Sequence, residues 1–323
     1  MNTKSYLDRF TFKVFQFAES KCGLQANDKI IVSVSGGVDS VSLLCLLDSF
    51  RQKIPLELHI VHFHHGLRKE SDHEEEFVKD LASRKKIECT VFRSDQFKDN
   101  KGMQVKAREW RIDKLINCKD RLSFDKIATG HHLDDFVETQ IWKLVRGTSL
   151  FSLQPLLPNN PPYIRPLLDT PKTDLKDYLE RIKQDWCEDV SNTSNDYTRN
   201  MIRNEIIPRL DKCSGGKLLE KFSAIGQESQ YLNSLFEELI SPDIFECSSL
   251  AYQSVVENNS LLAKEIIHRF LLYNGQQEIN RDNIERIYEL VLSGRGNWSL
   301  DLKEGIKVEG AKKKIRVVPG IQS

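Results

Sequence analysis

The chain has 323 residues, of which 39% are apolar and 29% charged, and its 47 basic side chains balance 47 acidic ones. Ordinary apolar content and zero net charge argue against disorder and predict a globular protein of one to three domains. Neutrality also argues against indiscriminate nucleic-acid binding, although a local basic patch is compatible with it. The sequence has no run near the ~20 apolar residues of a bilayer span. It has no secretory signal at residues 1–23 either, so we expect a cytoplasmic protein with no membrane partner.

The seven cysteines are scattered along the chain, and no two of them form a C-x-x-C pair. Regular cysteine spacing is typical of a zinc ribbon, a cysteine-ligated iron–sulfur cluster or a disulfide framework. We therefore expect buried or incidental thiols and no protein-bound metal centre.

The first half of the chain alternates strand-like and helix-like segments. Apolar, β-rich runs predict strands, and the segment after each run has apolar residues at helical spacing. In chain order the strands are expected at 29–35, 56–62, 88–93 and 126–130, and the helices at 40–50, 71–86, 103–122 and 132–146. Four such units with short connections predict an α/β fold, a doubly wound and mostly parallel sheet with helices on both faces. Ligands of such sheets collect beyond the carboxyl ends of the strands.

The second half is predicted to be mainly helical. A Pro- and Asn-rich stretch at 151–166 is expected to be loop, and residues 217–240 have the apolar spacing of a long amphipathic connector helix. Two further helices and a strand hairpin are expected at 260–273, at 280–292 and around Glu309-Gly310. We therefore expect a catalytic α/β domain, a linker helix and a small α+β domain at 1–212, 213–240 and 241–323.

The strongest local motif is a glycine-rich turn between the first strand and the helix that follows it. Its residues are Ser35, Gly36, Gly37, Val38, Asp39 and Ser40. The two glycines let backbone N–H groups approach an anion, and the helix adds unpaired N–H groups and a positive dipole end. The serine hydroxyls add donors, and the Asp39 carboxylate is a candidate ligand for Mg²⁺. The motif differs from the G-x-x-x-x-G-K-[ST] loop, and the alternative is a turn that binds no ligand.

A second cluster, GHHLDDFVET at 130–139, follows the fourth predicted strand. Asp135 and Glu138 are three residues apart and share a helix face near the carboxyl end of that strand. Carboxylates there can hold a cationic substrate and deprotonate an attacking amine. The alternative is a solvated acidic first turn favoured by the helix dipole, but His131 and His132 are not needed for that role. Adjacent histidines point in different directions, which disfavours a zinc site.

Pairs of arginines about one helical turn apart occur at two places. Arg108 and Arg111 lie in AREWR on the third predicted helix, and Arg199 and Arg203 lie in YTRNMIR in the presumed interdomain region. Such pairs can bind phosphate or stack on a base. For the first pair, the alternative is a solvated charged face with Trp110 in the core.

Two further segments carry basic or titratable side chains. The sequence HFHHGLR at 62–68 has three histidines, but neighbouring strand residues alternate between faces, so their convergence on a metal is disfavoured. Arg68 is better placed to bind phosphate or RNA. Lys312, Lys313 and Lys314 near the end of the chain are suited to an RNA contact, and protection of an edge strand by lysines is an equally good alternative.

Taken together and in this order, the motifs resemble the tRNA(Ile)-lysidine synthetase family, part of the PP-loop ATP pyrophosphatase superfamily. The SGGVDS turn at 35–40 resembles the superfamily's pyrophosphate-binding loop, whereas HHLDDFVET, AREWR and YTRNMIR narrow the resemblance to the family. The resemblance covers residues 25–210 well and continues weakly to about 318, without the extra C-terminal domain of longer members. It implies an adenine nucleotide alpha hydrolase-like fold.

The resemblance implies a ligase that joins L-lysine to C2 of the wobble cytidine in an isoleucine tRNA with the anticodon CAU. ATP and Mg²⁺ are the implied cofactors, with ATP bound on residues 35–40. The C2 oxygen of cytidine would be adenylated with loss of pyrophosphate, and the lysine ε-amine would then displace AMP. A homodimer is compatible with the sequence.

The resemblance also implies roles for individual residues. Asp135 and Glu138, with His132, would bind lysine, and one of the two carboxylates would accept its proton. Asp39 would hold Mg²⁺ or the pyrophosphate of ATP. The basic side chains implied at the tRNA are Arg68, Arg108, Arg111, Arg199, Arg203, Lys312, Lys313 and Lys314.

Two other functions compete with this interpretation. A PP-loop tRNA thiolase making 2-thiocytidine would share the nucleotide loop but use paired cysteines and an iron–sulfur cluster, and the sequence lacks the cysteine pairs. A non-catalytic module that senses ATP would bind the nucleotide without turnover.

Overall fold

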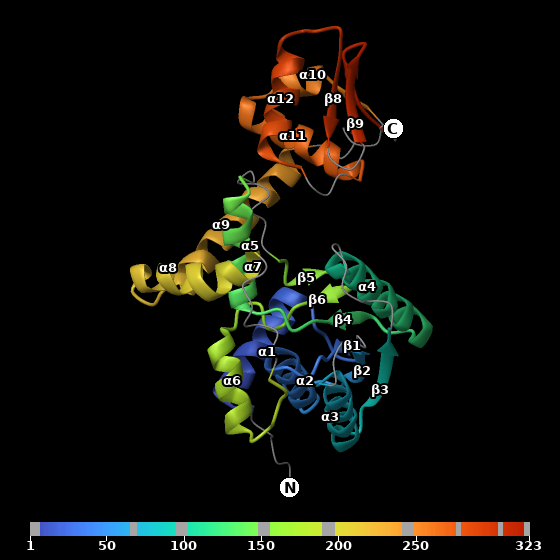
Figure 1. Cartoon of the computed structure of the whole chain (residues 1–323), viewed down its shortest axis with the longest axis vertical. Coiled ribbons are helices and arrows are strands. Elements are labelled where there is room, and N and C mark those ends of the chain that lie inside the picture. Colours follow the sequence, from blue (N-terminus) through green and yellow to red (C-terminus); the bar gives the residue numbers. More distant parts are fainter. Residues whose placement is uncertain are drawn as a thin grey trace. The chain divides into compact units, whose positions relative to one another are not determined.

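The computed structural model of the chain describes residues 7–64, 70–94, 103–147, 156–188, 198–240, 249–275, 279–302 and 306–319 (Figure 1). The chain divides into two compact units, one bounded by Met1–Thr139 and Leu156–Ser223 and the other by Gln140–Pro155 and Ala224–Ser323. Each unit has a sheet and a hydrophobic core of its own. The three-part division at 212 and 240 stays a prediction.

The described residues of the first unit form a six-stranded sheet in the order β3-β2-β1-β4-β6-β5. The strands are β1 (Lys29–Ser33), β2 (Glu57–His64), β3 (Glu88–Arg93), β4 (Lys126–Ala128), β5 (Asn159–Asn160) and β6 (Tyr163–Ile164). β1 runs parallel to β2 and β4, with Ile31 opposite His59 and Ile127, and β3 and β6 continue the parallel pairing outward. Only β5 at the edge pairs antiparallel among these strands. The predicted doubly wound, mostly parallel sheet is confirmed.

The two short strands β5 and β6 correct the expectation that 151–166 is loop. Tyr163 and Ile164 add to the sheet beside β4, because the backbone N–H of Ile127 donates to Pro162 O and that of Thr129 donates to Ile164 O. Strands of two residues carry no periodic apolar pattern, so the Pro and Asn content dominated the sequence signal.

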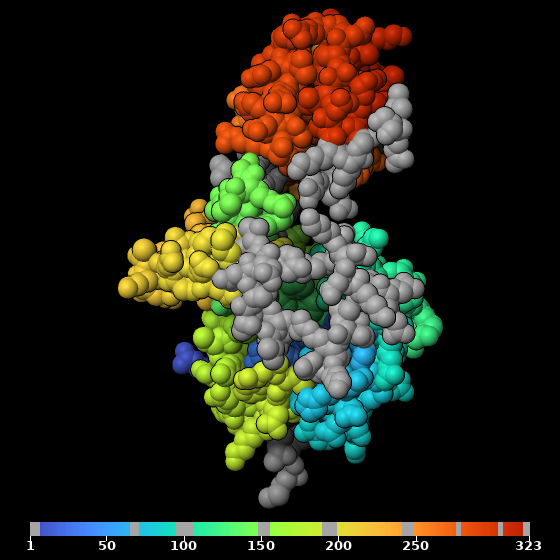
Figure 2. Space-filling model, viewed as in Figure 1, coloured from blue at the N-terminus to red at the C-terminus, as the bar shows by residue number. Residues whose placement is uncertain are grey.

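Helices cover both faces of this sheet. One face carries α1 (Arg9–Cys22), α2 (Val38–Phe50), α3 (Glu70–Lys85) and α6 (Lys172–Arg181), and the other carries α4 (Met103–Leu122). Neighbouring residues of a strand face opposite sides, so Ile30 and Val32 pack in the first core and Ile31 in the second. The mostly apolar α2 lies between α6 and α3, whose surfaces are visible on either side in Figure 2.

Two more described helices of this unit are α7 (Thr198–Met201) and α8 (Ile207–Ser214), whereas α5 (Leu133–Val145) and α9 (Leu218–Leu239) each begin in the first unit and end in the second. A π-helical turn, η3 (Ile202–Ile206), joins α7 to α8, and its end is marked by the Ile207 N–H donating to Ile202 O. The sequence predicted arginines one helical turn apart here but not the π-turn. The predicted amphipathic helix at 217–240 corresponds to α9.

The second unit has a four-stranded antiparallel sheet in the order β7-β10-β9-β8 among its described residues. Its elements are β7 (Ser249–Ala251), α10 (Gln253–Val256), α11 (Ser260–Tyr273), α12 (Arg281–Leu292), β8 (Asn297–Leu302), β9 (Ile306–Ala311) and β10 (Lys314–Pro319). The helices pack on the sheet around Phe270, Ile287 and Val308. A small α+β unit at the C-terminal end is therefore confirmed. Within the described residues, no helix is both long and apolar enough to cross a membrane.

The position of the last hairpin turn differs from the prediction. Glu309 and Gly310 lie inside β9, and the turn is formed by Lys312 and Lys313, whose φ angles are 51° and 59°. Gly310 is required inside the strand because a side chain there would overlap Trp298 and the Tyr252 hydroxyl. Gly310 was taken to indicate a turn, but it allows a close packing contact within a strand.

Candidate active site

The glycine-rich turn at residues 35–40 connects the carboxyl end of β1 to α2, as the sequence predicted. Its side chains and backbone bond to one another: Ser35 N–H donates to Ser40 Oγ (3.1 Å), and Ser40 Oγ donates to Gly37 O (3.0 Å). Gly36 has a φ of 101°, a conformation that side chains other than glycine rarely adopt. Gly37 is the N-cap of α2 and supplies no side-chain bond to its first N–H groups. The turn therefore presents backbone donors to an anion.

Two neighbouring segments close around this turn. The Cys187 N–H donates to Gly36 O (2.9 Å), and a Cβ at position 36 would lie 3.4 Å from Cys187 Sγ. A Cβ at Gly130 would lie 3.2 Å from the backbone of Asp39 and Ser40. Glycine at 130 therefore lets the β4–α5 connection approach the first turn of α2. Neither contact was predicted from the sequence, where Gly130 was noted only as the first residue of the second motif.

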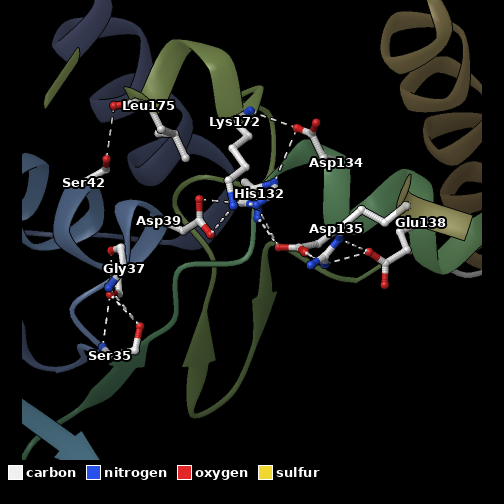
Figure 3. Close-up of polar contacts among 12 residues, drawn as sticks. Ser35, Gly37, Asp39, Ser42, His132, Asp134, Asp135, Glu138, Lys172 and Leu175 are labelled. Atoms are coloured by element: carbon white, nitrogen blue, oxygen red, sulfur yellow. Dashed lines mark hydrogen bonds and ion pairs between the residues drawn. The ribbon is translucent and has the colours of Figure 1, made fainter. Parts of the chain in front are cut away.

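His132 joins the glycine-rich turn to the acidic start of α5 (Figure 3). Its Nε2 lies 3.5 Å from both Asp39 Oδ1 and Asp135 Oδ2, and its Nδ1 lies 3.5 Å from Asp134 Oδ2. The ring is buried, with 3% of the residue exposed. Burial alone would lower the pKa of His132, but the contacts with Asp134 and Asp39 and the charge of Asp135 raise it to about 9. His132 is therefore a buried cation among carboxylates at neutral pH.

His131 has the opposite electrostatic state. Burial lowers its pKa to about 4, and its Nδ1 forms a hydrogen bond with Thr129 Oγ1 (2.9 Å). The ring is therefore neutral at physiological pH. The two histidines face different partners, as expected for adjacent residues. Among the described residues, no three His, Cys, Asp or Glu side chains are arranged to hold a metal ion.

Lys172 is a member of the cluster that the sequence analysis missed. Its Nζ donates to Asp39 Oδ2 (3.1 Å), and its backbone N–H donates to Asp134 Oδ2 (2.9 Å) (Figure 3). The start of α6 is held near α2 by Ser42 Oγ, which donates to Leu175 O (3.3 Å). A lysine in the first turn of a helix opposes the helix dipole. That local mismatch is the sequence signal that could have identified it.

The predicted carboxylate pair is already bound by an arginine of the chain. Arg203 Nε and Nη2 donate to Glu138 Oε2 at 2.8 and 2.7 Å, and Nη2 lies 3.3 Å from Asp135 Oδ1. Arg199 Nε lies 3.9 Å from Glu138 Oε1. Glu138 is buried, and burial raises its pKa although Arg203 opposes the rise. The structure thus brings together Asp135, Glu138 and two arginines that the sequence assigned to separate roles.

The other predicted basic residues lie at several places. Arg108 and Arg111 are exposed on α4, and the charge of Arg108 contributes to lowering the pKa of His131. Trp110 packs edge-on against Phe63, with ring centroids 5.3 Å apart. Arg68 lies outside the described residues.

Lys312, Lys313 and Lys314 belong to the second unit. β10, which begins at Lys314, lies between β7 and β9. The alternative that these lysines protect an edge strand is therefore wrong for the sheet described. Lys312 and Lys313 are exposed in the turn that precedes β10.

The arrangement at residues 35–40 fits a nucleoside triphosphate with Mg²⁺. Asp39 Oδ1 is buried and accepts no hydrogen bond within the described residues, although the His132 ring lies 3.5 Å away, so the oxygen keeps a lone pair for a second cation. Mg²⁺ commonly takes one or two carboxylate ligands and fills its shell with phosphate oxygens and water. Asp39 would supply the protein ligand, while the backbone donors of the turn would hold the phosphates.

The chain is similar to known proteins over most of its length. The profile of the PP-loop domain family matches residues 7–210. A tRNA(Ile)-lysidine synthase of Petrotoga mobilis is 31% identical over 294 residues, which is 89% of this chain and 93% of that protein. Another, from Pseudothermotoga lettingae, is 31% identical over 94% of this chain and 68% of its own length.

A solved structure shares the fold. The U34-tRNA thiolase NcsA of Methanococcus maripaludis, determined with its [4Fe-4S] cluster, superposes with a TM-score of 0.57 at 18% identity. The match covers 74% of this chain and 81% of that one. It supports the PP-loop architecture.

Proposed function

The chain belongs to the tRNA(Ile)-lysidine synthase family of PP-loop proteins, and on this premise we propose how its residues carry out the family's reaction. The enzyme joins the ε-amino group of L-lysine to C2 of the wobble cytidine of tRNA(Ile), using ATP. We place the reaction at the carboxyl ends of β1 and β4 and infer a cytoplasmic enzyme that acts on tRNA with a CAU anticodon. The observation that carries the site assignment is the position of His132, within 3.5 Å of both Asp39 and Asp135.

In the first proposed step, the C2 oxygen of cytidine attacks the α-phosphorus of ATP and pyrophosphate leaves. The backbone N–H groups of residues 35–40 hold the departing phosphates, as expected of a helix N-terminus. Bound Mg²⁺ would neutralise phosphate charge. Asp39 is held by Lys172 on one oxygen and faces His132 with the other, so its carboxylate is fixed at the turn.

In the second proposed step, the lysine amine attacks C2 and AMP leaves with the former C2 oxygen. The amine must first lose a proton, because an ammonium ion has no lone pair. Glu138 is suited to accept that proton, since burial raises the pKa of its carboxyl and brings it closer to that of an effective general base. Asp135 supplies a second carboxylate on the same helix face to hold the ammonium group.

Basic side chains would bind the tRNA. Arg108 and Arg111 are exposed on α4, and Arg199 and Arg203 have side chains that are 52% and 40% exposed. Guanidinium groups bind phosphates through paired hydrogen bonds. We also assign Lys312, Lys313 and Lys314 of the second unit to tRNA, and Arg68 retains this role as a prediction.

The test is an incorporation assay with labelled L-lysine, ATP, Mg²⁺ and unmodified tRNA(Ile) with a CAU anticodon. The proposal expects one lysine in the tRNA for each pyrophosphate released. The same tRNA with uridine at the wobble position is the matched control and should accept no lysine. ATP binding without turnover would instead indicate a nucleotide sensor, and a stoichiometric iron–sulfur cluster with sulfur transfer would indicate a thiolase.

A further inference from the structure

Arg203 occupies the place at which the proposed function puts the substrate ammonium group. Its guanidinium donates twice to Glu138 Oε2 and lies 3.3 Å from Asp135 Oδ1. Two carboxylates separated by one helical turn repel each other unless a cation lies between them. The chain supplies that cation itself, so lysine and Arg203 compete for the same oxygens.

We propose that Arg203 is an internal substitute for the lysine ammonium group, and that it sets the order of binding by leaving Asp135 and Glu138 when tRNA binds. This inference rests on the proposed assignment of that carboxylate pair to lysine. An RNA phosphate takes the guanidinium, and the ammonium of lysine takes the carboxylates. The exchange conserves the ion pairs: the carboxylates lose one cation, Arg203, and gain another, lysine. The guanidinium of Arg203 loses the carboxylates and gains another anion, the phosphate.

The exposure of the groups favours this exchange. Glu138 has 7% of its side chain exposed, so leaving it ionised without a cation would be costly. Arg203, in contrast, has 40% of its side chain exposed and can reach a ligand outside the cluster. Arg199, one turn earlier, is also exposed and contacts Glu138 at 3.9 Å. A phosphate bound by both arginines would draw positive charge away from Glu138.

The backbone that carries Arg203 supports the same inference. Arg203 lies in the π-turn η3, between the α-helical segments α7 and α8. π-turns are rare and occur mostly as single turns, often at functional sites. Their hydrogen bonds link residues five apart, so each hydrogen-bonded loop holds one residue more than in an α-helix. A return to α-helical geometry would rotate the side chain by about 100° around the helix axis, away from its present partners.

The inference predicts that lysine and tRNA bind cooperatively. Lysine binding to the full chain is measured by titration calorimetry at pH 8.5, with and without unmodified tRNA(Ile). The nucleotide is an ATP analogue whose bond between the α and β phosphates cannot be cleaved. For the wild-type protein, tRNA should lower the lysine Kd by about tenfold, a typical coupling between two sites. Arg203→Gln should bind lysine about tenfold more tightly than wild type without tRNA, and tRNA should then add little.

Two matched variants serve as controls. Arg203→Lys keeps a cation at the carboxylates and should retain most of the dependence on tRNA. Arg209→Gln removes an exposed arginine from the following helix and should bind lysine as the wild type does. An Arg203→Gln protein whose lysine Kd without tRNA equals or exceeds that of the wild type would overturn the inference.

Two further measurements separate the possible failures. If Glu138→Gln binds lysine normally, the proposed lysine site is wrong. If Glu138→Gln loses lysine binding while Arg203→Gln changes nothing, only the inference about Arg203 is wrong. Should Arg203→Gln not fold, the wild-type protein still provides a test, because linkage requires lysine to raise tRNA affinity by the factor by which tRNA raises lysine affinity. An unchanged tRNA affinity in saturating lysine would overturn the inference.

Discussion

Two adjacent regions of the first unit hold their polar groups by different means. The turn at residues 35–40 is one short stretch, in which Ser35, Gly37 and Ser40 bond mainly to one another. The start of α5 is a charged cluster whose members come from four separate segments, with Asp39, the backbone of Lys172 and Arg203 contacting residues of 132–138. The turn depends on local backbone geometry, whereas the cluster depends on tertiary packing and on protonation. Substitutions should therefore disturb the two regions in distinguishable ways.

Asp39 belongs to both regions, so its substitution is expected to have the largest effect. Asp39→Asn keeps the size of the side chain but removes the charge that faces His132 and Lys172. We expect tRNA-dependent pyrophosphate release to fall by roughly 100-fold or more, as when a group that organises a transition-state charge is lost. Asp48→Asn, on the same helix, is the control and should retain activity. A rate within threefold of wild type would show that the turn alone suffices.

The charged cluster should also be visible in the pH dependence of stability. The pKa of His132 is raised to about 9 in the folded protein, against about 6.5 in an unfolded chain. Its contribution is therefore fully present below pH 6.5 and is lost as the pH rises through 9. We expect His132→Gln to cost up to roughly 3 kcal/mol of unfolding free energy at pH 6 and much less at pH 9.5, measured by urea denaturation.

The neighbouring His131 provides a control of opposite sign. Burial lowers its pKa to about 4, so the unfolded chain binds the extra proton between pH 4 and 6.5 and stability falls as the pH falls through that range. His131→Gln should therefore relieve acid destabilisation and leave the alkaline limb unchanged. If both variants show the same pH profile, the two rings do not differ in charge as described.

The contrast between the two regions also explains what could be predicted from the sequence. The turn was identified because its signal is local: a β-rich run, two glycines and a helix pattern in consecutive residues. The carboxylates were identified because Asp135 and Glu138 are on one helical face. The parallel sheet followed from the repeated strand–helix alternation.

The remaining features depend on contacts that no local pattern encodes. Lys172 reaches Asp39 across 133 residues of chain, and Arg203 reaches Glu138 across 65. From the sequence, Arg199 and Arg203 lie about one turn apart, and we predicted that they bind phosphate. The sequence gave no sign that α5 lies beside them, so their contact with Glu138 was not predicted. The π-turn escaped prediction for a similar reason, since its extra residue is invisible in the apolar spacing.

Lys172 tests whether the cluster acts on the nucleotide as well as on Asp39. Its side chain is 43% exposed, so its pair with Asp39 contributes little stability, but its ammonium can reach a phosphate held at the turn. We expect Lys172→Met to weaken ATP binding by about tenfold, the size of one charged hydrogen bond, with little change in thermal stability. Lys172→Arg should restore most of the affinity. Lys176→Met, one turn further along α6, should behave as wild type, and equal losses in both variants would contradict a specific role.

The smallest effect is expected for Lys312, Lys313 and Lys314 in the second unit, which belong to neither region of the site. Since β10 has neighbours on both sides, Lys312, Lys313 and Lys314 are not needed to protect an edge. The tRNA contact that we propose for them can be tested by substitution. Lys312 and Lys313 have positive φ, where asparagine is tolerated better than alanine. A variant with Asn at both positions and Gln at 314 should therefore fold and bind tRNA several-fold more weakly.

The salt dependence of tRNA binding measures how many phosphate contacts are lost. The slope of log affinity against log salt should become shallower by about one unit per lysine. The control Lys307→Gln, which removes the partner of Glu309, should leave the slope unchanged. An unaltered slope in the triple variant would mean that these lysines do not touch the phosphate backbone of the tRNA.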